Sequence, residues 1–245
     1  MRRRTLLLIL VLALTGCAAV APDGRPEAYH YQMGLSYLGE QNYTAALKEL
    51  RESEKLSPRN PELQYYLGRV YRGKQRPDLA VVKFLRAIDL KPDYSIARND
   101  LGVTYMELKQ WDKAIEQFRI VKDDLLYEEH TNSVINLGLA YLGKGDYAKA
   151  LAELEAARVN NPGNPIVKVA IGRVLAAQGQ MREAVAEYRG ALKVYPEYAM
   201  AHYYLGIALM KNDLAAARNE FREVVRLAPD TEFGKSAHEY LNLLR

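Results

Sequence analysis

Residues 101–118 read LGVTYMELKQWDKAIEQF, and the spacing of the apolar residues in this stretch decides the fold. Leu101 and Tyr105 are four residues apart, as are Ala114 and Phe118, and residues at this spacing share one face of a helix. The periodic pattern is interrupted between the two pairs. The stretch therefore predicts two amphipathic helices joined by a short turn, which is a helical hairpin.

The same pattern recurs along most of the chain around a glycine. The repeat glycines are separated by 34, 34, 36, 34 and 34 residues, and they are Gly34, Gly68, Gly102, Gly138, Gly172 and Gly206. A fixed period of this length is typical of a repeat architecture. One hairpin cannot bury its apolar face alone, whereas stacked hairpins bury a continuous core. The sequence therefore predicts an all-α solenoid of six hairpins over residues 27–230.

Small residues and prolines mark the place of each helix within a repeat. Proline forbids the helix from continuing ahead of it, so a recurrent proline predicts the end of the second helix; these prolines are Pro58, Pro92, Pro162, Pro196 and Pro229. In the third repeat Leu126 stands in place of that proline. An alanine follows the glycine after twelve residues, and we expect the two to face each other: Gly34 with Ala46, Gly68 with Ala80, Gly138 with Ala150. The predicted repeats are residues 27–60, 61–94, 95–130, 131–164, 165–198 and 199–230.

Residues 231–245 predict one further helix. Its apolar face carries Phe233, Ala237, Tyr240, Leu241 and Leu244, and its opposite face is polar. A solenoid needs a terminal element whose outer face is polar, so we expect this helix to cap the array.

The pattern resembles the tetratricopeptide repeat family, as in His30-x-x-Met33-Gly34-x-x-Tyr37 and Ala184-x-x-x-Tyr188. The resemblance spans residues 27–229 and implies a right-handed superhelix whose first helices line a concave groove. In this family the groove residues lie three before, one after and four after the repeat glycine. The candidate partner-binding residues are Tyr31, Leu35, Leu38, Tyr65, Arg69, Arg72, Asn99, Val103, Met106 and Leu139. The same positions elsewhere are Ile135, Leu142, Val169, Arg173, Ala176, Tyr203, Ile207 and Met210.

Tyrosine, leucine, methionine and isolated arginine dominate this groove, a composition that suits an apolar or amphipathic peptide. The Lys/Asn set with which some family members clamp a terminal carboxylate is missing. Any single groove position could instead pack against a neighbouring helix. We expect Tyr65→Ala and Arg69→Glu to impair partner binding without unfolding the array.

The first residues predict export. Arg2–Arg4 precede the apolar run Leu6–Leu14, as in a secretory signal, and the run is shorter than the about 20 residues that span a bilayer. We therefore assign residues 1–16 to a signal peptide. These arginines supply three of the four net positive charges of the chain, so the remainder carries +1. A nearly neutral chain gives no electrostatic case for binding nucleic acid.

Cys17 is the only cysteine, and Leu14-Thr15-Gly16-Cys17 resembles the lipobox of bacterial lipoproteins. The resemblance implies lipidation of Cys17, with acyl chains such as palmitate. Ala18 follows in place of the aspartate that retains lipoproteins in the inner membrane, which favours an outer-membrane anchor with the repeats in the periplasm. Residues 17–26 read as the acylated cysteine and a short tether.

No catalytic constellation is apparent in the sequence. The four histidines are scattered over different repeats, and Glu128-Glu129-His130 are adjacent, so they do not share a helical face. A single cysteine cannot build a thiolate metal site. We expect no enzyme activity, metal, cofactor or small-molecule substrate, and a protein as the partner.

The combination of lipobox, tether and six repeats resembles the type IV pilus biogenesis and stability lipoproteins, the secretin pilotins. The stretch Asp124-Leu125-Leu126-Tyr127-Glu128 carries the finer resemblance, although the family often has proline after that tyrosine. The resemblance implies a scaffold that holds a secretin subunit and assists its localisation and multimerisation. The alternatives are a periplasmic adaptor for peptidoglycan hydrolases or proteases, and a factor for envelope assembly or polysaccharide export.

Overall fold

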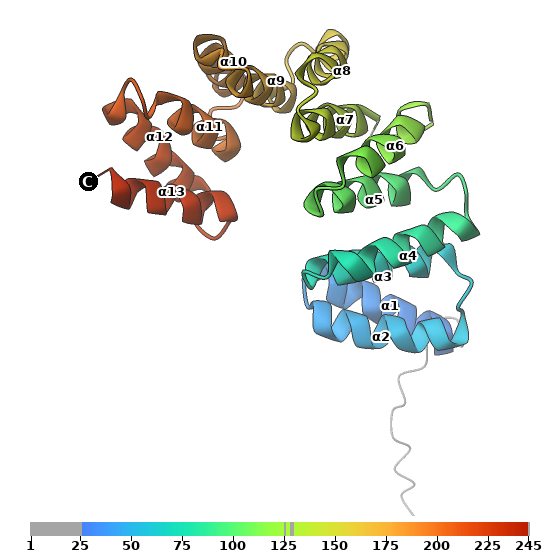
Figure 1. The fold of residues 1–245 in the computed structure, drawn as a ribbon. Coiled ribbons are helices and arrows are strands. Elements are labelled where there is room, and N and C mark those ends of the chain that lie inside the picture. Colours follow the sequence, from blue (N-terminus) through green and yellow to red (C-terminus); the bar gives the residue numbers. More distant parts are fainter. Residues whose placement is uncertain (1–25, 125, 128–129, 245) are drawn as a thin grey trace, which may run out of the picture.

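The computed structural model describes residues 26–124, 126–127 and 130–244. The predicted signal peptide, Cys17 and residues 17–25 of the predicted tether lie outside these residues. The described chain forms thirteen α-helices (Figure 1). They are α1 (Pro26–Gly39), α2 (Tyr43–Leu56), α3 (Pro61–Gly73), α4 (Pro77–Leu90), α5 (Ser95–Glu107), α6 (Trp111–Lys122), α7 (His130–Lys144), α8 (Tyr147–Asn160), α9 (Pro165–Ala177), α10 (Met181–Val194), α11 (Ala199–Leu209), α12 (Leu214–Leu227) and α13 (Glu232–Leu243).

The helices form two layers that follow one arc (Figure 1). Each odd-numbered helix contacts the next odd-numbered helix, from α1 with α3 to α11 with α13, whereas the even-numbered helices contact only their neighbours along the chain. The odd-numbered helices therefore form the inner, concave layer and the even-numbered helices the outer layer. This arrangement confirms the predicted all-α solenoid.

Local sequence signals explain where the helices begin and end. Asparagine or aspartate side chains accept a hydrogen bond from the first turn of α2, α3, α8, α9 and α12, which satisfies a backbone donor that has no partner within the helix. Proline opens α3, α4 and α9, where its fixed φ suits a first helical turn. The second helices end two residues before Pro58, Pro92, Pro162, Pro196 and Pro229.

Each repeat glycine faces a large residue of the second helix, which was not predicted from the sequence. A Cβ at Gly68 would lie 2.5 Å from Phe84, and one at Gly34 would lie 2.5 Å from Leu50. The corresponding neighbours are Phe118 for Gly102, Leu154 for Gly138, Tyr188 for Gly172 and Phe221 for Gly206. Glycine thus makes room for a buried ring or leucine from the second helix, and this contact sets how closely the two helices pack.

A left-handed residue closes the turn inside each of the first five hairpins. It lies seven residues after the repeat glycine, with φ between 56° and 85°: Gln41, Gln75, Lys109, Gly145 and Gly179. The sixth hairpin is one residue shorter here, so Phe221 follows Gly206 by 15 residues rather than 16. Asn212 and Asp213 instead donate their backbone N–H groups to the Leu209 carbonyl.

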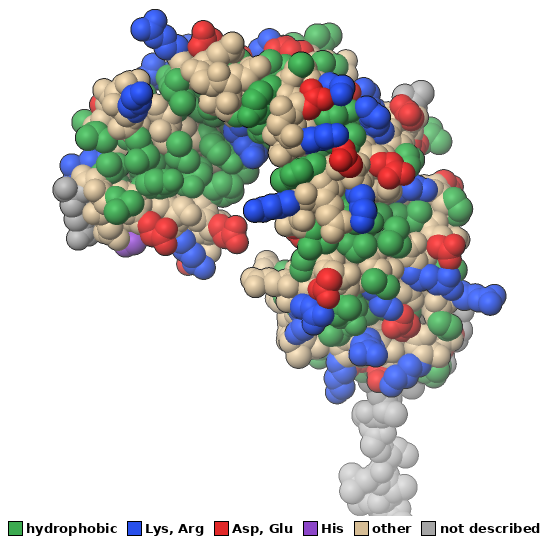
Figure 2. All heavy atoms as spheres, in the orientation of Figure 1, with side chains coloured by type: hydrophobic (Ala, Val, Ile, Leu, Met, Phe, Trp, Pro, Cys, Tyr) green, Lys and Arg blue, Asp and Glu red, His purple; other side chains and the backbone are tan. Residues whose placement is uncertain are grey.

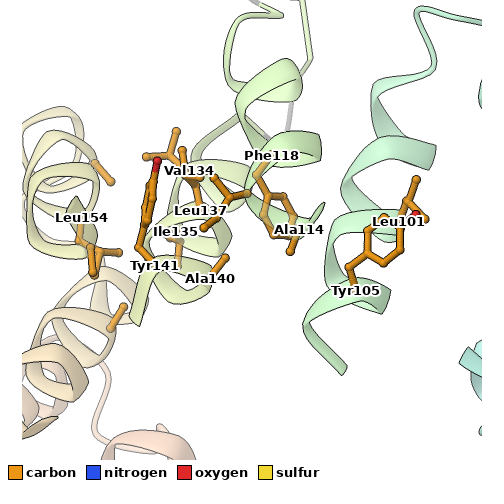
Figure 3. Packing of buried hydrophobic residues seen from close by; sticks show 14 of the residues in the cluster. Leu101, Tyr105, Ala114, Phe118, Val134, Ile135, Leu137, Ala140, Tyr141 and Leu154 are labelled. Carbon is orange, nitrogen blue, oxygen red and sulfur yellow. The ribbon is translucent and has the colours of Figure 1, made fainter. Parts of the chain in front are cut away.

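The apolar core is continuous through the middle of the array. Leu101 from α5, Phe118 from α6, and Leu137 and Tyr141 from α7 belong to one buried cluster (Figure 3). Tyr105 and Tyr141 are buried, as expected for their position in the repeat, while Tyr37 and Tyr71 are half-buried at the edge of the core. At the irregular junction between α6 and α7, Leu126 is 92% exposed and takes no part in the core.

Helix α13 covers the C-terminal end of the array, as predicted. Tyr240 stacks on Phe221 of α12 with ring centroids 4.8 Å apart, and Phe233 meets Tyr203 of α11 edge to face at 5.0 Å. Ala237 is fully buried beneath them. Within the described chain, none of the helices combines the length and apolar character needed to cross a bilayer.

Candidate protein-binding groove

The N-terminal part of the concave face is built on tyrosines. Tyr31 of α1 meets Tyr66 of α3 edge to face at 6.0 Å, Tyr66 meets Tyr65 at 5.0 Å, and Tyr65 meets Tyr94 at 5.5 Å. Burial, together with the nearby Tyr66 and Glu62, raises the pKa of Tyr31 to about 12. The hydroxyl of Tyr31 therefore stays neutral and can serve as a hydrogen-bond donor.

Two predicted groove residues of α3, Tyr65 and Arg69, occupy different environments. Tyr65 is only 4% exposed, and its hydroxyl is hydrogen-bonded to Asp100 of α5. Burial raises the pKa of Tyr65, and Asp100 raises it further. Arg69 is exposed, and its guanidinium lies 5.8 Å from the ring centre of Tyr65 and 5.9 Å from that of Tyr66. The buried Tyr65 therefore stabilises the wall of the groove from within, whereas the exposed Arg69 side chain is accessible to a partner.

Arg72 is already engaged with acidic residues of α5. Its guanidinium lies 3.6 Å from a carboxylate oxygen of Asp100 and 3.4 Å from one of Glu107. Burial raises the pKa of Glu107, an effect that Asp100 reinforces and Arg72 opposes. A polar hollow of about 490 Å³ lies here, with Leu38 and Arg69 also in its wall. The groove is therefore polar and open beside repeats 1–3.

In the middle of the groove, the predicted residues mostly pack between helices. Asn99 of α5 is 8% exposed, and its side-chain oxygen accepts hydrogen bonds from Ser133 at 3.1 Å and Asn136 at 3.3 Å, both on α7. Val103, Met106 and Leu139 are partly buried against the core, as Leu35 is partly buried on α1. Asn99 therefore joins two inner helices and has little surface for a partner.

The C-terminal part of the groove contains an apolar hollow of about 230 Å³. It opens between α7, α9, α10 and α11, and in Figure 2 hydrophobic side chains gather around α11 beside the opening of the arc. Its wall is formed by Leu142, Arg173, Ala176, Ala177, Met181, Tyr188, Tyr204, Ile207 and Ala208. Among these side chains, only that of Arg173 is charged.

Arg173 is held at this hollow by aromatic rings. Its guanidinium lies 4.9 Å from the ring centre of Tyr204, the distance of a cation–π contact. Tyr204 in turn stacks on the buried Tyr188, with ring centroids 6.0 Å apart. Burial raises the pKa of Tyr188, although Arg173 opposes the shift.

Position counting from the repeat glycine found part of the hollow and missed part of it. Leu142, Arg173, Ala176 and Ile207 lie at the predicted inner positions, although they are not among the ten candidates. Tyr204, two residues before Gly206, lies outside the three positions, as do the outer-layer residues Met181 and Tyr188. Tyr66 is likewise two before Gly68, so a tyrosine at this position is a signal that could have been used.

The described residues contain no cluster of three or more His, Cys, Asp or Glu side chains able to hold a metal ion. The groove brings together rings, methyl groups and guanidinium groups, which are the side chains that anchor protein interfaces.

The family model of the tetratricopeptide repeat matches residues 31–95, 99–165, 135–193 and 169–231. The chain belongs to the tetratricopeptide repeat family. It is therefore a scaffold of the protein-interaction type, and members of this family are generally non-catalytic.

Among curated proteins, the chain is similar to human superkiller complex protein 3, with 26% identity over 188 residues, covering 73% of this chain and 12% of that protein. It is also similar to bovine BBSome complex member BBS4, with 26% identity over 173 residues, covering 71% of this chain and 32% of that protein. The chain thus spans less than a third of the length of either relative.

Two solved structures of pilus-related proteins share the fold over nearly their whole length. Pseudomonas aeruginosa pilF superposes with a TM-score of 0.65 and 23% identity, covering 88% of this chain and 97% of that chain. PilW, described as a widely conserved type IV pilus biogenesis factor, superposes with a TM-score of 0.70 and 18% identity, covering 86% of this chain and 98% of that one.

Proposed function

We propose that this chain is a lipid-anchored scaffold of the outer membrane that holds a segment of the type IV pilus secretin in its concave groove. In this proposal Cys17 carries the lipid, the repeats lie in the periplasm, and the scaffold assists localisation and multimerisation of the secretin. The observation that carries it is the groove, whose exposed Arg69 and apolar hollow suit an amphipathic segment.

Two further points support the pilus assignment. The lipobox-like Leu14-Thr15-Gly16-Cys17 and the short tether are features of the pilotin lipoproteins that the chain resembles. The fold likeness to pilF and PilW extends over 97% and 98% of those chains, so the whole array, rather than a few repeats, has their architecture. Anchoring and binding on one chain would also raise the local concentration of the secretin at the membrane.

The test is to delete the gene and assay outer membranes for heat- and detergent-resistant secretin multimers. We expect the multimers to be lost and to return when the native gene is supplied. A Cys17→Ala gene should fail to restore them and should yield a protein that is not labelled by radioactive palmitate. Normal multimers in the deletion strain would refute the pilus role.

A second candidate is a role in polysaccharide export. The chain is similar to cellulose synthase operon protein C of Pseudomonas fluorescens, with 23% identity over 198 residues, covering 72% of this chain and 15% of that protein. In that case the deletion strain would assemble secretin normally and would lose secreted polysaccharide. Measuring both products in the same strain separates the two candidates.

A further inference from the structure

Two arginines at the inner positions of the groove have no ion-pair partner among the described residues. At the three inner positions of the six repeats, the only charged residues are Arg69, Arg72 and Arg173. Arg72 is neutralised by Asp100 and Glu107. In the part of the chain that the structure describes, Arg69 and Arg173 make ring contacts but no ion pair. These two arginines therefore present their charge to whatever enters the groove.

The hollow beside Arg173 has room for a large apolar side chain. Its volume of about 230 Å³ exceeds the engineered cavities of about 150 Å³ that bind benzene. Its wall is formed by aliphatic and aromatic side chains such as Leu142, Ile207 and Tyr204. Covering this surface with a phenyl or isobutyl group removes apolar area from water on both sides, which favours binding.

Arg173 lies in the wall of the hollow, where it can contact the partner residue next to the apolar side chain that enters the hollow. The ring of Tyr204 holds its guanidinium against the wall of the hollow, so little side-chain freedom is left to lose on binding. A carboxylate beside the hollow would gain charge-assisted hydrogen bonds from this guanidinium. An ammonium group at the same place would be repelled.

We propose that the hollow formed by repeats 4–6 is a specificity pocket that takes one phenylalanine or leucine side chain of a partner protein segment, and that Arg173 pairs with an aspartate or glutamate next to it. The occupant is thus an acidic amphipathic segment. This inference rests on the proposal that the groove receives a protein segment and is independent of which protein supplies it.

The experiment uses a displayed library of randomised peptides and the full chain as bait. We expect the selected peptides to share a phenylalanine or leucine flanked by aspartate or glutamate. A peptide from this set should lose about tenfold or more in affinity when the acidic residue is changed to lysine, since a hydrogen bond to a charged group contributes about 1.5–3 kcal/mol.

Three variants locate the binding site. Arg173→Glu should reverse the preference, so that it selects lysine or arginine beside the apolar residue. Ala177→Trp, an exposed position in the wall of the hollow, should abolish the preference for the apolar residue. Arg222→Glu makes the same charge change at an exposed position of the outer helix α12, and it should select the same peptides as the native chain. Circular dichroism confirms that each variant is folded.

A library that enriches nothing, or only polar or basic peptides, would overturn the inference, as would an unchanged preference in Arg173→Glu. Its failure is distinct from failure of the pilus role. Normal secretin multimers in the deletion strain together with acidic amphipathic selection would refute the pilus role and leave the specificity pocket in place. Loss of the multimers in the deletion strain, without selection of acidic amphipathic peptides, would support the pilus role and refute the specificity pocket.

Discussion

One methyl group added at a repeat glycine would collide with the buried core of the array. A Cβ at Gly68 would lie 2.5 Å from Phe84, which is fully buried and cannot move aside without disturbing the core. We expect Gly68→Ala to lower the free energy of unfolding by about 1–3 kcal/mol, the usual cost of overpacking. Chemical denaturation measures this change.

Gly39→Ala is the matched control, because no atom lies within 4 Å of a Cβ built at that helical position. Alanine favours the helix over glycine, so this variant should be as stable as the native chain or slightly more stable. An equally stable Gly68→Ala variant would contradict the role assigned to the repeat glycine.

At a left-handed turn residue, a change to glycine should raise the free energy of unfolding rather than lower it. Gln75 has φ 58°, a conformation that costs a non-glycine residue about 1–2 kcal/mol. Gln75→Gly removes that cost but adds flexibility to the unfolded chain, so we expect a net gain of about 0.5–1 kcal/mol. Gly179→Ala should lose a similar amount, since φ is 81° and a Cβ there meets nothing within 4 Å. Thermal unfolding measures both variants. The melting temperature should rise in Gln75→Gly and fall in Gly179→Ala, and any other result would contradict this prediction.

At the scale of the elements, helix α13 depends on one close backbone contact. A Cβ at Gly234 would lie 2.1 Å from the Ala228 carbonyl oxygen and 2.7 Å from that of Pro229. Backbone atoms cannot move aside as a side-chain tip can, so Gly234→Ala should displace α13 from α11 and α12. We expect faster amide hydrogen exchange in α11–α13 and little change in α1–α6, because each repeat contacts only its neighbours. Lys235→Ala, an exposed change one residue on, should leave exchange unaltered.

His202 ties α11 to the loop before it and to α12. Its ring nitrogens lie 2.6 Å from a Glu220 carboxylate oxygen and 2.8 Å from the Pro196 carbonyl oxygen. Burial lowers the pKa of His202, but the hydrogen bonds to Glu220 and Pro196 outweigh it, so the net pKa is raised. A raised folded-state pKa stabilises the fold below the ordinary value of about 6.5 and loses that contribution as pH rises through the raised pKa.

We therefore expect His202→Gln to lower the melting temperature more at about pH 5 than at about pH 8.5, on either side of that titration. The measurement is thermal unfolding of both chains across this pH range. His238→Gln, on an exposed face of α13, is the control for replacing a histidine with glutamine. A pH-independent effect of His202→Gln would mean that the residue acts only through packing.

At the scale of the whole molecule, the arc forms a groove in which buried side chains stabilise the fold and exposed side chains are available to a partner. The expectation that Tyr65→Ala leaves the array folded does not suit a ring that is 4% exposed and packed among other rings. We expect this variant to lose about 3–5 kcal/mol of stability, as large aromatic truncations in cores do. Arg69→Glu changes only an exposed side chain and should weaken partner binding while keeping the melting temperature. Circular dichroism measures the stability of both variants and binding assays measure their affinity for a partner. Together they distinguish a residue that stabilises the fold from one that contacts the partner.

The sequence by itself determined the helices and their order. The three- and four-residue apolar spacing, the six glycines and the recurrent prolines are local signals, and each acts within one or two turns of helix. They were sufficient to predict six hairpins and the capping helix. The inner layer, and the inward positions of Leu142, Arg173 and Ile207, were expected from the resemblance to the tetratricopeptide repeat family rather than from these local signals.

Only the tertiary structure decided which side chains contact one another. The large side chain that each repeat glycine accommodates, a ring or leucine fifteen or sixteen residues on, was not predicted, because the facing side chain depends on how closely two helices pack. The hollow beside Arg173 combines residues of α7, α9, α10 and α11, which lie as far apart in the chain as Leu142 and Ala208. Such a site depends on the curvature of the stack, a property that no single repeat encodes.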